Sequence, residues 1–155
     1  MNLSEMGLSG LRPSVEFAFL ADAVQVVGGK LFALGGGWDQ LLVSRFPTRH
    51  SSMGIGMRIT FPRGWDKSPV SMGVDLQDQD GKSILGARMP QRRLPVKSPP
   101  GLSPGSVFGY PMAFTFNALP FESAGDYSFV IYLEEEPVHR LRFTVRERRS
   151  RSPRI

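Results

Sequence analysis

The stretch from Ser52 to Phe61, SMGIGMRITF, alternates apolar residues with small or polar residues at every step. Successive side chains of a β-strand point to opposite faces of the sheet, so this period of two predicts a half-buried strand. The residues expected on the buried face are Met53, Ile55, Met57, Ile59 and Phe61.

The same alternation recurs in four further segments, at residues 70–77, 111–117, 127–134 and 139–146. No window of a dozen residues shows a convincing helical stripe. The segment SVEFAFLADAVQVV, residues 14–27, is apolar almost throughout and fits a buried helix or a long strand covered on both faces. Its β-branched end and the following Gly-Gly favour the strand. We therefore predict an all-β fold, a two-layer antiparallel β-sandwich of about seven or eight short strands.

Turn residues separate these strands. Gly28 and Gly29 suit the positive φ angles of a two-residue hairpin, and Asp80-Gly81 is a second hairpin signal. Lys30 after two glycines resembles part of a phosphate-binding loop. That loop requires G-x-x-x-x-G-K-[ST] and a helix, whereas here the chain continues in a strand pattern. A structural hairpin is therefore preferred to a phosphate site.

A second glycine cluster lies shortly after the first. Gly35, Gly36 and Gly37 are predicted to form a bend or bulge where the chain leaves one sheet. This bend would let Trp38 fold over the core. A recognition patch formed by Trp38 and Asp39 is the alternative.

Residues 87–106, ARMPQRRLPVKSPPGLSPGS, contain five prolines. Proline lacks a backbone donor, so strand pairing is not expected to continue through this segment. We predict a proline-rich basic loop that crosses from one sheet to the other. Its cations are Arg88, Arg92, Arg93 and Lys97.

The net charge of +5 is unevenly distributed, because residues 146–155 hold five arginines and one glutamate. We expect a flexible N-terminus at residues 1–13, a single domain at 14–147 and a disordered basic tail at 148–155. The chain has no cysteine, which excludes disulfides and cysteine-bound metals and fits a cytoplasmic location. Neither a signal peptide nor an apolar stretch of membrane-spanning length is visible.

The stretch from Phe121 to Val145 resembles the final hairpin of immunoglobulin-like bacterial domains, in which Gly-x-Tyr opens the penultimate strand, here Gly125 and Tyr127. The tyrosine hydroxyl in such domains bonds nearby backbone. The longer pattern, from about residue 15 to 145, resembles an uncharacterised actinobacterial family, a domain of unknown function. Its most specific part is residues 21–38. The resemblance implies an immunoglobulin-like β-sandwich, a structural role for Tyr127 and no catalytic residues.

Catalytic and metal-binding patterns are weak. Asp78 and Asp80 precede Gly81 as in a calcium loop, but the chain lacks the other ligands of an EF-hand. We therefore predict no catalytic, cofactor or metal site. An unrecognised enzyme would have to draw on Asp22, Asp39 and His50.

The function expected from the sequence is a non-enzymatic module that binds an unknown protein. Trp65 lies in the polar turn FPRGWDKSP, where exposure and core packing are equally expected, and an exposed tryptophan favours binding. The contact would use Trp65 and the basic loop at 88–105. The alternative is auxiliary nucleic-acid binding through the basic loop and the arginine tail.

Overall fold

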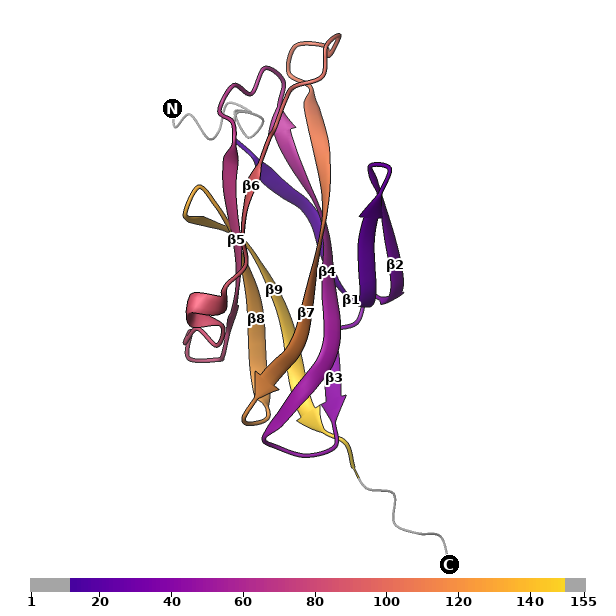
Figure 1. Ribbon diagram of the computed structural model, residues 1–155, viewed down its shortest axis with the longest axis vertical. Coiled ribbons are helices and arrows are strands. Elements are labelled where there is room, and N and C mark those ends of the chain that lie inside the picture. The colour runs from indigo at the N-terminus through magenta and orange to yellow at the C-terminus, as the bar shows by residue number, and fades with distance from the viewer. Residues whose placement is uncertain (1–11, 150–155) are drawn as a thin grey trace, which may run out of the picture.

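The computed structural model describes residues 12–149, in which nine strands form two facing sheets (Figure 1). The four-stranded sheet has the order β2-β1-β4-β7 and the five-stranded sheet the order β3-β9-β8-β5-β6. The predicted all-β sandwich is confirmed, with nine strands where about seven or eight were expected. The strands are β1 (Ser14–Val27), β2 (Lys30–Gly36), β3 (Gln40–Val43), β4 (Thr48–Pro62), β5 (Val70–Gln77), β6 (Gln91–Leu94), β7 (Val107–Phe121), β8 (Gly125–Leu133) and β9 (Glu136–Glu147).

Most of the predicted flexible N-terminus and basic tail lies outside the described residues. Within them, the first strand begins at Ser14 and the last ends at Glu147.

The core lies between the two sheets and is built from the alternating apolar residues. All five apolar residues predicted on the buried face of β4 have no exposed surface. They meet Val74, Leu76 and Ile131 of the facing sheet in one hydrophobic cluster. Phe129 packs against Phe116 across the sandwich, with ring centroids 5.0 Å apart. The period of two therefore identified the buried faces correctly.

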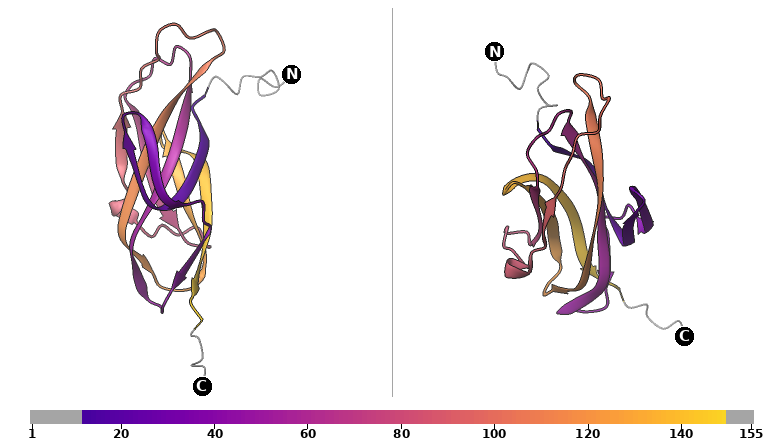
Figure 2. Two further views of the ribbon diagram at one scale, coloured as in Figure 1. Left: turned by 90° about the vertical axis from the view of Figure 1, so that its right-hand side faces the viewer. Right: turned by 45° about the horizontal axis from the view of Figure 1, so that its top comes forward.

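β1 is divided between two partners. Its first half pairs with β4, from Ser14 opposite Thr60 to Ala21 opposite Gly54, and its second half pairs with β2. Residues 21–36 therefore form a hairpin, here called the hairpin arm, which stands beside the sandwich in Figure 1. Figure 2 (left) shows it lying over the four-stranded sheet. The expectation that β1 is covered on both faces is wrong, because the hairpin arm turns one face to solvent.

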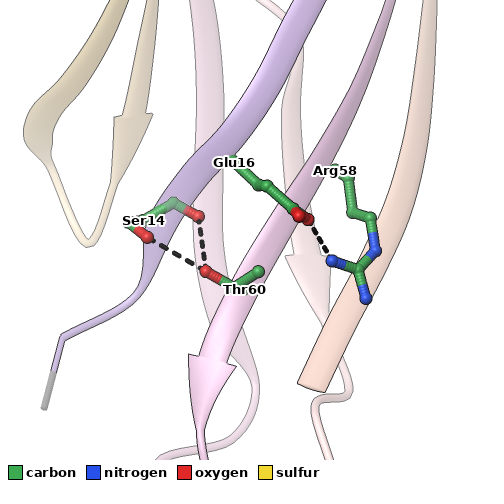
Figure 3. Close-up of polar contacts among 4 residues, drawn as sticks. All are labelled: Ser14, Glu16, Arg58 and Thr60. Carbon is green, nitrogen blue, oxygen red and sulfur yellow. Dashed lines mark hydrogen bonds and ion pairs between the residues drawn. The ribbon is translucent and has the colours of Figure 1, made fainter. Parts of the chain in front are cut away.

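Polar contacts hold the first half of β1 to β4 (Figure 3). The hydroxyls of Ser14 and Thr60 lie 3.0 Å apart, and Arg58 forms an ion pair with Glu16. Exposed ion pairs contribute little on their own, so we attribute the pairing mainly to the backbone ladder and the buried side chains.

Two glycines of β4 provide the seat for β1 and the hairpin arm. A Cβ atom at Gly54 would lie 2.4 Å from Cγ1 of Val24, and one at Gly56 would lie 2.5 Å from Cζ of Phe19. Both glycines are therefore needed for close approach on the outer face of the sheet.

The chain crosses from the four-stranded to the five-stranded sheet between Gly36 and Gln40. Gly35 and Gly37 have φ angles of 60° and 84°, which glycine adopts without steric cost. β3 then pairs with β9 in parallel, so the expectation of a purely antiparallel sandwich is wrong for this pair. β3 and β9 are not joined by a hairpin, because the chain enters β3 from the opposite sheet, so the two strands can run parallel.

Two predictions about loops are corrected. Residues 87–106 are not wholly irregular, because β6 pairs with β5 inside them, between Pro90 and Pro95. The four residues between these prolines keep their backbone donors, so pairing is possible there. Asp80-Gly81 forms a turn closed by a single bridge between Gln77 and Ser83, and the next element is a short 3-10 helix rather than a strand.

Candidate functional site

The hairpin arm exposes an apolar face to solvent. Its turn is Gly28-Gly29, with φ angles of 57° and 74°, and the cross-strand pairs Ala23–Leu34, Gln25–Phe32 and Val27–Lys30 share one face. Val27, Phe32 and Leu34 on that face are 54%, 52% and 74% exposed. Three large apolar side chains side by side in water are unusual unless they serve an interaction.

The opposite face of the hairpin arm is turned towards the sandwich. Val24 is only 8% exposed and packs over Gly54 of β4, while Val26, which is 38% exposed, and its cross-strand neighbour Leu31 lie farther along the same face. Val24 and Val26 also line an open groove with Ala113 and Thr115 of β7. This packing presents the apolar outer face in a defined orientation.

The residues that were predicted as a partner-binding group do not all lie free on the surface, although the turn before Trp65 contacts the basic loop, where the Gly64 N–H donates a 3.1 Å hydrogen bond to the Ser98 hydroxyl. Trp65 is not a free surface anchor: it is partly buried against the core, with its ring 5.9 Å from that of Phe61. Its indole Nε1 is buried without a hydrogen-bond partner among the described residues. Arg88, Arg92, Arg93 and Lys97 are all exposed.

Arg92 of the same group is engaged within the fold. Its guanidinium carbon lies 4.0 Å from the ring centroid of Phe114, which is a cation–π contact between the edges of the two sheets. Partial burial lowers the pKa of Arg92, although a guanidinium stays protonated in proteins. The loop at 87–106 therefore offers fewer free cations than the sequence suggested. Nucleic-acid binding through it stays a prediction, and most of the arginine tail lies outside the described residues.

The residues predicted to be structural lie at turns and packing positions. Tyr127 is buried, and its hydroxyl donates a 2.6 Å hydrogen bond to the carbonyl oxygen of Ser123, the type of contact that the family resemblance implied. Gly125 opens β8 with a φ of 154°. Trp38 packs against the core just after the glycine cluster, and its Nε1 finds no hydrogen-bond partner among the described residues.

Acidic residues gather at one end of the sandwich. An open hollow of about 330 Å³ is lined there by Asp78, Asp80, Glu122 and Asp126 among others. The Asp78 carboxylate accepts hydrogen bonds from the backbone N–H groups of Asp80 and Lys82, which explains the turn without a ligand. Within residues 12–149, no group of three His, Asp or Glu side chains could hold a metal ion.

The three residues considered for an enzyme lie on different elements. Asp22 is on β1 in the hairpin arm, Asp39 is in the crossover before β3, and His50 is on β4 opposite Leu119. No helix in the described part of the chain has the length and apolarity needed to cross a membrane.

Comparison with known proteins gives the family. The model of a family of unknown function, DUF6941, matches residues 16–146, which include the hairpin arm and both sheets. The chain belongs to the DUF6941 family. The expected membership of an uncharacterised family is thereby confirmed, and the family brings no assigned activity to this chain. No curated protein matches it.

Two solved structures are similar to this DUF6941 chain in fold. One is the C-terminal domain of Wzt, with 16% identity, a TM-score of 0.47 and coverage of 97% of this chain and 91% of that chain. The other is an immunoglobulin-like protein from Pseudomonas aeruginosa, with 10% identity, a TM-score of 0.38 and coverage of 89% and 99%. Likeness at this level concerns the fold alone.

The sequence did not reveal the exposed apolar face of the hairpin arm. The sequence does show that the period of two is broken here, because apolar residues fall on both faces of the two strands. These residues are Val24, Val26 and Val27 on one strand and Leu31, Phe32 and Leu34 on the other. Apolar residues on both faces predict a strand that is covered twice. Only the structure shows that one of these faces is open to water.

Proposed function

We propose that this DUF6941 protein is a non-enzymatic cytoplasmic module that binds another protein through the outer face of the hairpin arm. The observation that carries the proposal is the row of exposed side chains Val27, Phe32 and Leu34. Covering apolar area is worth about 25 cal/mol per Å², and aromatic residues at the centre of a contact contribute most. The hairpin arm has the chemistry of a binding surface.

The geometry supports a pre-formed surface. The inner face of the hairpin arm rests on Gly54 through Val24, so the outer face needs no rearrangement before it contacts a partner. A surface held in its bound conformation loses less conformational entropy on association. The hairpin arm carries one acid, Asp22, and one base, Lys30, and the polar Gln25 lies opposite Phe32, so Val27, Phe32 and Leu34 supply the apolar area of the outer face.

The test is capture of a partner from the native host by the full chain and by the double variant F32S/L34S. Both side chains point away from the sandwich, so the variant should keep its stability and lose the partner. V107S is the matched control, because Val107 is similarly exposed, at 48%, and lies at the start of β7. A partner retained by F32S/L34S as fully as by V107S would refute the proposal.

The basic loop is tested by charge removal instead of deletion. Leu94 and Val96 within it are buried, so removing residues 88–105 would damage the core. R88Q, R93Q and K97Q combined change only exposed side chains. If this triple variant lost the partner and F32S/L34S did not, the contact would lie on the basic loop and the hairpin arm would be excluded.

A further inference from the structure

Among the strands that end the two sheets in the described residues, β2 has an outer edge without the protection found on β7, β6 and β3. β7 carries Pro111 and Pro120, and β6 lies between Pro90 and Pro95 with two arginines in its four residues. β3, the remaining edge, is only four residues long. Proline, charge and short length are the usual devices against edge-to-edge pairing. β2 has seven residues, a single charge at Lys30 and no proline.

The hairpin turn determines which backbone groups of β2 are free. A two-residue loop makes Val27 and Lys30 a hydrogen-bonded pair, and bonded pairs alternate along an antiparallel ladder. Phe32 therefore bonds to β1, while the N–H and C=O groups of Leu31 and Ala33 point to the open edge. These are the groups that an additional strand would use.

The regular part of this edge is centred on Phe32. Gly29 and Gly35 have φ angles of 74° and 60°, so the extended segment runs from Lys30 to Leu34. When the segments of two chains pair antiparallel about a two-fold axis and overlap over their full length, Phe32 of one chain lies opposite Phe32 of the other. The free groups of Leu31 then face those of Ala33 in the second copy, and four backbone hydrogen bonds result.

We propose that a second copy of this chain occupies the edge, so that two β2 strands pair antiparallel and join the two four-stranded sheets. Phe32 meets Phe32 of the second copy as a close cross-strand aromatic pair, and Lys30 lies opposite Leu34 of the second copy. Asp22 lies at the base of the hairpin arm and Lys30 beside its tip, and the two-fold axis brings base and tip together. The two Lys30 side chains lie at opposite ends of the paired strands, so like charges stay apart.

This inference goes beyond the proposed function, because it concerns the edge of the hairpin arm and not its outer face. Pairing also brings the exposed residues Val27, Phe32 and Leu34 of both copies onto one continuous surface. A partner bound to the outer face would then contact two chains at once.

The absence of cysteine allows a test of both pairing and register. Hydrogen-bonded partners lie about 5.5 Å apart at Cα, within the range of about 4.4–6.8 Å for a disulfide. A mixture of L31C and A33C chains should therefore form a mixed disulfide under mild oxidation. At micromolar chain concentrations it should form about a hundredfold faster than in the control mixture of L31C and A23C. Ala23 is also exposed but lies on β1, away from the edge.

Sedimentation of the unmodified chain gives the second measurement, and a dimer is expected that A33P abolishes. The Ala33 N–H points outward, so A33P removes an intermolecular donor and leaves the bonds within the hairpin arm in place; thermal unfolding checks that the variant is folded. The proposal would be overturned if the wild-type chain stayed monomeric. It would also be overturned if L31C and A33C formed the mixed disulfide no faster than the control mixture of L31C and A23C. A monomeric A33P chain that still captures the partner would support the proposed function on its own, because the substitution leaves the outer face unchanged.

Discussion

Gly54→Ala tests the seat of the hairpin arm. The added Cβ would lie 2.4 Å from Cγ1 of Val24 and 3.2 Å from the carbonyl oxygen of Phe114, whereas carbon atoms pack at about 3.5–4.0 Å. Such overpacking costs about 1–3 kcal/mol, and the loss of glycine flexibility in the unfolded chain returns about 0.4–1 kcal/mol. We expect the free energy of unfolding to fall by about 1–2 kcal/mol.

Two comparisons separate this mechanism from a general effect of changing glycine. Gly56→Ala should cost less, because the Phe19 ring that it meets ends a side chain that can turn away, whereas the β-branched Val24 is stiff. Val24→Ala removes the opposing methyl groups. In the double variant G54A/V24A the new methyl group should occupy the space that Val24 vacates. The double variant should therefore lose less stability than the sum of the losses of G54A and V24A.

The assay is urea denaturation followed by tryptophan fluorescence, combined with thermal unfolding. A loss of about 1–2 kcal/mol corresponds to a fall in Tm of about 2–8 °C for a chain of this size. The reasoning fails if G54A is as stable as the wild type, or if the costs of G54A and V24A are additive within error. Either result would mean that the hairpin arm does not rest on this glycine.

Two further predictions concern side chains singled out by the sequence. Tyr127→Phe keeps the buried ring and removes the hydrogen bond to Ser123, so thermal denaturation should report a loss of about 0.5–1.5 kcal/mol; an unchanged Tm would contradict a structural role for the hydroxyl. Arg92→Gln should cost about 0.5–2 kcal/mol through the lost contact with Phe114, whereas R93Q, at an exposed position, should stay within about 0.5 kcal/mol of the wild type in urea unfolding. Equal effects of the two substitutions would show that the cation–π contact adds no stability.

Much of the fold was predictable because the alternation of apolar and polar residues in the sequence matches the faces of the strands that are buried in the structure. The five apolar residues of β4 and the closing β8–β9 hairpin follow the alternation and the turn residues directly. The loop predictions were less successful. β6 was missed since four proline-free residues between two prolines have no pattern of their own, and they form a strand only because β5 offers an open edge.

The candidate site was harder to predict, because exposure depends on what lies opposite. Trp65 stands in a polar turn, yet its ring packs on Phe61, so the neighbouring residues in sequence did not indicate its environment. Arg92 is exposed as expected, yet its guanidinium lies over Phe114, which is 22 positions away. Contacts between the edges of two sheets have no local signature.

By itself, the order of side chains determined that this polypeptide forms pleated strands, which residues are buried between them, and that the glycine pair at 28–29 reverses the chain. Those properties depend on steric and hydrophobic preferences that act within a few residues. Tertiary structure alone decided that one hairpin leaves the sandwich, rests on Gly54 through Val24, and turns Phe32 and Leu34 towards water. The physical reason is that burial is a property of two surfaces, and the second surface lies far along the chain.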